Sequence, residues 1–295
     1  MEPDFACADV EFDRAPFTRG MTAYSSLLPL RGGPLACRIM QLAFARGAYV
    51  AGGLARTVLT PRGGAPSDAA YEAVKLYVKS FNGDVDLFFS DKRSLDAFWV
   101  DYSTDGVIRA AAPKLTTLPS GAAAEITLDE VRIQVVNKLL VPIEEQLRRF
   151  DIFNGMVAFN EAETVVPHGW AELEEQNLLH VLNWSSIFVI HRLAKWHHKQ
   201  GYTGLSPRTA AEIGSVALDI IDALRKNPRP TAWGGQMTHN DVAKKLKRFL
   251  PYLSAEQLLL VSTIQPIDSY EGAFGILQRR AAQHDLNNKA EVVVT

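Results

Sequence analysis

A diglycine and, further along the chain, a pair of aspartates constrain the fold of this sequence more than any other feature. Gly52-Gly53 follows a short apolar run and Asp84-Val85-Asp86 leads into another, so both motifs are expected at strand ends. Side chains two residues apart on a strand point to the same face. The spacing therefore places the carboxylates of Asp84 and Asp86 side by side and directs Val85 toward a core.

This pair of motifs carries a chemical expectation. Two adjacent carboxylates repel each other unless a cation lies between them, and hard oxygen ligands suit Mg²⁺ that arrives with substrate phosphates. Glycines that open a helix let a triphosphate approach the backbone, and Arg56 one turn later adds positive charge. Each motif alone also occurs without a ligand, in a tight turn or on a solvated edge strand. Their order along the chain favours a phosphoryl-transfer site.

Composition excludes several classes of protein. The chain has 295 residues, of which 47% are apolar, as expected for a folded core. Its 31 basic and 33 acidic residues give a net charge of −2, so RNA contact would need a local patch rather than an overall field. No apolar run of about eighteen residues is present, the first residues are acidic, and two cysteines match no zinc spacing. These features predict a cytoplasmic protein without a membrane span.

Periodicity predicts an α/β front half and a helical back half. In the front half, helices are expected at 34–46, from Gly53 and from Ser67 or Asp68, strands at 48–51, from Asp84 and at 150–159, a hairpin at 124–128 and 131–136, and a helical turn after Pro142. In the back half, helices are expected at 170–182, 184–199, 207–226, 238–249, 255–263 and 272–285. The predicted fold class is α+β, a mixed β-sheet head with flanking helices followed by an all-α body.

The same pattern predicts four parts along the chain. A proline-rich N-terminal arm covers 1–33, the head 34–165, a helical neck 166–226 and a C-terminal helical region 227–295. No internal repeat or low-complexity segment interrupts this order.

Four segments resemble a known family. Residues 48–56, AYVAGGLAR, and 83–87, GDVDL, are similar to the signature of the polymerase-β-type nucleotidyltransferases, most of all to class II tRNA nucleotidyltransferases and bacterial poly(A) polymerases. Residues 148–155, RRFDIFNG, resemble that branch's RRDFTxNA segment, with phenylalanine and aspartate exchanged and glycine in place of alanine. Residues 188–205 resemble its neck helix. The segments occur in the family's order.

The resemblance implies a head and a neck of the nucleotidyltransferase type. It also implies nucleotidyltransferase activity. The enzyme would use Mg²⁺ to move a nucleoside monophosphate from an NTP such as ATP to an acceptor hydroxyl. An RNA 3′ end is the implied acceptor, and a protein side chain or a small molecule stay open. The implied catalytic residues and metal ligands are Asp84 and Asp86, and the implied nucleotide-binding residues are Gly52, Gly53, Arg56, Arg149, Asp151, Asn154, Arg192 and Lys195.

The chain also departs from the family's pattern. Thr57 stands where the branch has an aspartate, and Gln134 is expected where a third carboxylate would lie, with Asp151 or Glu125 as compensating groups. A two-carboxylate site could transfer slowly or only bind nucleotide. The alternative is therefore a weakened nucleotidyltransferase fold that serves as a binding or structural module in a larger assembly.

The charged side chains on the later segments also have structural interpretations that involve no ligand. An arginine and an aspartate at 148–151 are also typical of an ion pair at a helix–strand junction. Arg192, Lys195 and Lys199 form one basic helical stripe, and such stripes are usually solvated. The run 244–248, KKLKR, could bind phosphates, although the charged outer side of a helix is favoured.

Overall fold

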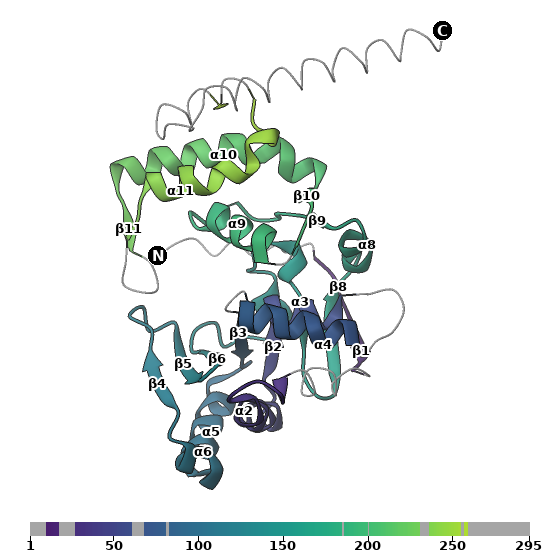
Figure 1. Cartoon of the computed structure of the whole chain (residues 1–295), viewed down its shortest axis with the longest axis vertical. Helices are drawn as coiled ribbons and strands as arrows, with labels where there is room; N and C mark the ends of the chain where they lie inside the picture. Colours follow the sequence, from purple (N-terminus) through teal and green to yellow (C-terminus); the bar gives the residue numbers. More distant parts are fainter. Residues whose placement is uncertain are drawn as a thin grey trace. The chain divides into compact units, whose positions relative to one another are not determined.

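The computed structural model describes residues 10–17, 27–60, 68–80, 83–184, 186–199, 201–230, 236–254 and 257–258. These residues group into two compact units (Figure 1). The first lies within Met1–Val189 and Lys195–Leu205, and the second within Ile190–Ala194, Ser206–Thr231 and Gly235–Thr295. The finer division into arm, head, neck and C-terminal region stays a prediction.

An eight-stranded sheet organises the first unit, in the order β1-β8-β7-β2-β3-β6-β5-β4. The strands are β1 (Phe12–Pro16), β2 (Tyr49–Ala51), β3 (Asp84–Phe88), β4 (Lys114–Thr117), β5 (Ala123–Leu128), β6 (Val131–Val136), β7 (Ala158–Phe159) and β8 (Glu163–Pro167). Within this described sheet, β3 and β6 pair parallel and the other neighbours pair antiparallel. The mixed sheet confirms the predicted head, and part of the predicted arm forms the edge strand β1.

Helices flank this sheet in the first unit (Figure 1). They are α2 (Gly33–Ala45), α3 (Gly53–Leu59), α4 (Asp68–Lys75), the π-helical turn η1 (Leu76–Ser80), α5 (Lys92–Thr104), α6 (Gly106–Ala111), α7 (Ile143–Leu147), the 3₁₀ turn η2 (Phe153–Gly155) and α8 (Trp170–Glu175). A small parallel pair, β9 (Leu178–Leu179) and β10 (Gly204–Leu205), completes it, and α9 (Val189–Lys199) has residues in both units.

Alternation along β3 separates a core face from a polar face. Val85 and Leu87 are fully buried and join the main core with Ile39 of α2 and Phe98 of α5. Burying side chains of this size stabilises a fold by about 1.5–3 kcal/mol each. Asp84 and Asp86 are half-buried on the opposite face. The core packing of the two apolar residues therefore fixes which way the two carboxylates point.

The second unit is mainly helical. It contains α10 (Pro207–Lys226), α11 (His239–Leu246), the 3₁₀ turn η3 (Lys247–Tyr252) and a small ribbon of β11 (Arg229–Pro230) and β12 (Gln236–Met237). Helices α10 and α11 pack side by side (Figure 1), through apolar side chains that recur every three or four residues on each helix. Apart from the ribbon, the predicted helical body is confirmed for the residues of this unit that the structure describes.

Several predicted elements differ in length or type. The predicted strand at 150–159 is wrong over most of its length, because Phe153 N–H bonds to the His180 carbonyl and the segment folds into η2 before β7. The helix predicted at 170–182 ends at Glu175, shortly before Asn177 with its φ of 55°. The helix predicted at 184–199 begins only at Val189.

Two other sequence-based expectations concern the end of the chain and the membrane. Of the helices predicted at 255–263 and 272–285, all but residues 257–258 lie outside the described residues. Among the helices that the structure describes, none is long and apolar enough to cross a membrane.

Candidate active site

The structure brings the aspartate pair and the diglycine turn together. Strand β2 pairs with β3 so that Ala51 lies opposite Asp86, and Gly52 directly follows. A Cβ atom placed on Gly52 would lie 3.7 Å from Asp86 Oδ2. The predicted juxtaposition is therefore present at the end of β2, on the polar face of the sheet.

Each glycine of the turn has its own structural requirement. Gly52 has φ 76° and ψ −138°, a backbone conformation that side chains disfavour. Gly53 begins α3, and a Cβ atom there would collide with the Tyr77 ring. Burial, followed by the charges of Asp86 and Asp84, raises the pKa of Tyr77 well above its ordinary value. The phenol therefore stays neutral, and it donates a 3.4 Å hydrogen bond to the Asp84 carbonyl.

A row of polar side chains extends from β3 across β6 to β5. Asp86 lies opposite Gln134, which lies opposite Glu125. Gln134 Nε2 donates to Asp84 Oδ2 at 3.3 Å and to Glu125 Oε2 at 3.4 Å. A neutral amide thus occupies the middle of the row. Of the two expected compensating groups, Glu125 stands at the far end, and Asp151 is buried.

Arg132 is the neighbour that the sequence did not reveal. It lies opposite Asp84 in the parallel pairing of β3 with β6, and its guanidinium forms an ion pair with the Asp84 carboxylate. Its Nη1 atom is also 4.0 Å from Glu125 Oε2. The guanidinium therefore neutralises part of the acidic row. Only the register of two strands far apart in the sequence could have predicted this contact.

Asp86 has the most unusual acidity in this row. Desolvation, followed by repulsion from Asp84, raises its pKa to about 7, although Lys195 and Arg132 oppose the rise. Lys195 is exposed on α9, so an exposed ammonium group acts on the Asp86 carboxylate. Perturbed acidity of this kind is common in functional sites and is also found in structural ion-pair networks.

The donor set fits a hard divalent cation. Mg²⁺ usually binds through one or two carboxylates, keeps several waters and accepts substrate phosphates as further ligands. Asp84 and Asp86 supply two carboxylates on one face of β3. Across the described part of the chain, no group of three or more His, Cys, Asp or Glu residues could hold a metal ion. With their two carboxylates on one face of β3, Asp84 and Asp86 are the residues that would hold Mg²⁺.

A second polar cluster is centred on Glu174 of α8. It contains two of the residues predicted to contact a nucleotide, Arg56 and Asn154. Glu174 Oε2 accepts hydrogen bonds from Arg56 Nε at 2.8 Å and Nη2 at 2.7 Å, and Oε1 accepts from Asn154 Nδ2 at 2.7 Å. Tyr202 also donates to Oε1, at 2.5 Å, and its ring lies 4.5 Å from the Arg56 guanidinium carbon. We call these four side chains the Glu174 hub.

All four members of the hub are buried. Asn154 also donates to the Leu178 carbonyl at 3.0 Å and accepts from the His180 N–H at 2.9 Å. The hub therefore ties α3, α8, η2 and the chain after α9 together. A nucleotide contact from Arg56 or Asn154 stays a prediction, and it would require these side chains to leave Glu174.

The remaining predicted nucleotide-binding residues are Arg149, Asp151 and Arg192. Arg149 is half-buried just after α7, and Asp151 is buried. Arg192 is exposed and lies among the residues of the second unit. Their roles stay predictions.

Gly155 explains one departure from the family's motif. A Cβ atom at this position would lie 2.8 Å from Cη2 of Trp196, so alanine would not fit beside the indole ring. Trp196 in turn stacks on Tyr202, with ring centroids 6.5 Å apart. The glycine in this segment is therefore matched to a tryptophan on α9.

Comparisons with known proteins give structural likeness only. Neither a scan against models of protein families nor a search of the curated proteins found a match. One similar solved structure is a CCA-adding enzyme with ATP, with 12% identity and a TM-score of 0.49, covering 85% of this chain and 54% of that chain. Another is a tRNA nucleotidyltransferase complexed with a primer tRNA and an incoming ATP analog, with 16% identity, a TM-score of 0.43 and coverage of 76% and 59%.

A third is the Thermotoga maritima CCA-adding enzyme complexed with tRNA, with 14% identity, a TM-score of 0.43 and coverage of 78% and 55%. The chain spans little more than half the length of these structures. At TM-scores below 0.5 they assign no activity to it.

Proposed function

We propose that the chain is a Mg²⁺-dependent nucleotidyltransferase that moves a nucleoside monophosphate from an NTP to an acceptor hydroxyl, and that the acceptor is an RNA 3′ end. The observation that carries this proposal is the position of Asp84 and Asp86, side by side on β3 and next to the Gly52 turn. The raised pKa of Asp86 supports it, because it reflects a desolvated carboxylate that Asp84 repels.

Each nearby residue has a distinct part in this proposal. Asp84 and Asp86 would hold Mg²⁺, which when bound lowers the pKa of an attacking hydroxyl and neutralises charge on the phosphates. Gly52 itself adds no side chain beside Asp86, and a Cβ atom there would meet Asp86 Oδ2 and Phe150 Cε2 only at 3.7 Å, so a phosphate oxygen would have room to approach the turn. The first N–H groups of α3 have no partner within the helix and would donate to that oxygen. Lys195 would add positive charge opposite Asp86.

Two contacts favour the second candidate, a nucleotide-binding module with weak or no catalysis. Arg132 already pairs with Asp84, and the neutral Gln134 stands in the row where the family would place a third carboxylate. Both features lower the negative charge that attracts a second cation. In this case the chain would bind Mg²⁺ with a nucleotide and release it unchanged.

Transfer of label from each of the four NTPs to short RNAs with defined 3′ ends, in the presence of Mg²⁺, tests the proposal. Asp84→Asn should lower the rate by about 10³-fold or more, since a lost metal ligand removes several kcal/mol of transition-state stabilisation. The matched control is Asp96→Asn on α5, an exposed aspartate paired with Lys92. The control should keep the wild-type rate.

A binding measurement separates the two candidates. A ligand at a hundred times its dissociation constant stabilises the folded state by about 2.7 kcal/mol, which thermal denaturation detects. Stabilisation by Mg²⁺ with ATP or CTP, together with no transfer to any acceptor, would identify the module. Absence of both effects would reject the nucleotide site itself.

A further inference from the structure

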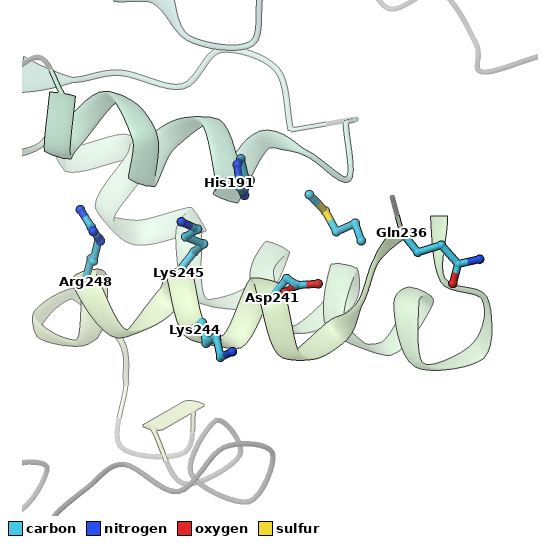
Figure 2. Close-up of a pocket in the computed structure, with 7 residues that line it drawn as sticks. His191, Gln236, Asp241, Lys244, Lys245 and Arg248 are labelled. Atoms are coloured by element: carbon cyan, nitrogen blue, oxygen red, sulfur yellow. The ribbon is translucent and has the colours of Figure 1, made fainter. Parts of the chain in front are cut away.

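A basic pocket lies in the second unit, and the proposed transfer reaction does not use it. The pocket has a volume of about 430 Å³ (Figure 2). It is lined by His191, Gln236, Met237, Asp241, Lys244, Lys245 and Arg248. All of these residues belong to the second unit, so the pocket is a feature of that unit alone.

One face of a helix supplies most of the charge. Asp241, Lys244, Lys245 and Arg248 follow the spacing i, i+3, i+4 and i+7, which aligns them along α11 and the start of η3. The opposite side of α11 is buried. His191 points toward α11 from α9, and Lys245 and Arg248 rise on the same side (Figure 2). Side chains from two helices therefore converge on one space.

The balance of charge in the pocket is positive. Asp241 is already engaged in the capping box of α11 as the partner of Thr238, because its Oδ2 accepts from Thr238 N at 2.9 Å and from Thr238 Oγ1 at 2.8 Å. These bonds lower its pKa, so it stays ionised. Within the described residues, no carboxylate lies within ion-pair distance of Lys244, Lys245 or Arg248. Three cationic side chains thus line the pocket together with one carboxylate that already belongs to the capping box of α11.

A solvated helix end explains only part of this arrangement. Cations in the last turn are favourable to the helix dipole, which accounts for Lys244 and Lys245. The dipole does not account for Arg248, which lies in η3, or for His191, which belongs to another helix. Like charges one turn apart also repel each other, so this face gains stability when an anion binds between them.

We propose that this pocket binds a phosphomonoester, either on a free mononucleotide or at the 5′ end of an RNA. A doubly charged phosphate suits several convergent cations, and the arginine fork adds paired hydrogen bonds to its oxygens. The volume matches sites for small molecules, and the buried Met237 with the exposed Gln236 provides an apolar contact and an amide for the attached group. A chain of phosphodiesters would instead suit a long basic surface.

The test uses the full chain in EDTA, so that binding does not depend on the metal site of the first unit. Calorimetry with adenosine 5′-monophosphate and with adenosine measures the contribution of the phosphate. Fluorescence anisotropy with one short RNA, carrying either a 5′-phosphate or a 5′-hydroxyl, measures the same group on RNA. The double variant Lys245→Glu/Arg248→Glu is compared with Lys226→Glu, which reverses one exposed charge on α10 outside the pocket.

We expect the phosphate to improve binding by tenfold or more on at least one of the two ligands. The double variant should remove this gain, and Lys226→Glu should keep it. A gain on the nucleotide or on the RNA end supports the proposal and identifies the source. Equal binding with and without the phosphate overturns it, as does a gain that survives in the double variant. Circular dichroism checks folding, and Lys245→Gln/Arg248→Gln replaces the double variant if charge reversal unfolds the unit.

Discussion

The two polar clusters of the first unit are built from similar side chains but differ in how their carboxylates are stabilised. In the Glu174 hub, one buried carboxylate receives hydrogen bonds from Arg56, Asn154 and Tyr202, and the arginine balances its charge. On β3, two carboxylates lie side by side, and one has its pKa raised to about 7. A satisfied network stabilises the fold, whereas a strained acidic pair has the properties of a site for a cation.

The largest expected effect is on the hub. Glu174→Ala leaves the Arg56 guanidinium buried without its partner, and loss of one member of a buried ion pair lowers the free energy of unfolding by about 3–5 kcal/mol. Urea denaturation measures this change. Glu175→Ala, one residue along α8 and exposed, should stay within about 0.5 kcal/mol of the wild type. Equal effects of the two substitutions would contradict the structural role of the hub.

Tyr202→Phe removes one hydrogen bond from the hub and should lower the free energy of unfolding by about 1–2 kcal/mol near neutral pH. Burial raises the pKa of Tyr202 above its ordinary value. The stability that depends on the neutral phenol is therefore complete below about pH 10 and is lost as the pH rises through the folded-state pKa. The variant should show a shallower alkaline loss of stability than the wild type. Parallel curves for the two proteins would argue against a buried, neutral phenol.

Gln134→Glu turns the strained row into a three-carboxylate row. Added negative charge between Asp86 and Glu125 should raise the affinity for Mg²⁺ by about tenfold, which corresponds to about 1.4 kcal/mol. Calorimetric titration with Mg²⁺ measures the change. Gln176→Glu adds the same charge at an exposed position beyond α8 and serves as the control. Unchanged affinity would show that Gln134 does not face the cation.

Asp86→Asn should raise the free energy of unfolding by about 1 kcal/mol at pH 8, because it removes a desolvated charge that Asp84 repels. The same substitution should abolish stabilisation by Mg²⁺. Thermal denaturation with and without Mg²⁺ measures both effects, with Asp96→Asn as the control. A decrease in stability would mean that Asp86 belongs, like Glu174, to a satisfied network.

Local patterns in the sequence predicted the arrangement of the acidic pair on β3 and of the neighbouring turn. Alternation fixed the direction of Asp84 and Asp86, and the diglycine marked a turn whose backbone needs glycine. Arg132 was not predictable, because it meets Asp84 only through the parallel register of β3 and β6. The absence of a charge at Gln134 was visible in the sequence, but not its two hydrogen bonds.

The hub could not be predicted from local patterns. Glu174 lies between other acidic residues on α8, and nothing in the sequence distinguishes it from Glu172 or Glu175. Its partner Arg56 is 118 positions away. The error over 150–159 has the same origin, since the backbone of that segment bonds to residues 180–183 rather than to a continuous strand partner. Pairings over such separations depend on the whole fold.

The buried pair of Arg56 and Glu174 also limits how this protein can evolve. A change at either position alone would leave an uncompensated charge in the interior, so the two are expected to be retained together or replaced together. Tyr202 and Asn154 should be retained or replaced together with this pair, because they bond to the same carboxylate. Among descendants of a common ancestor, variation at these four positions should therefore be correlated.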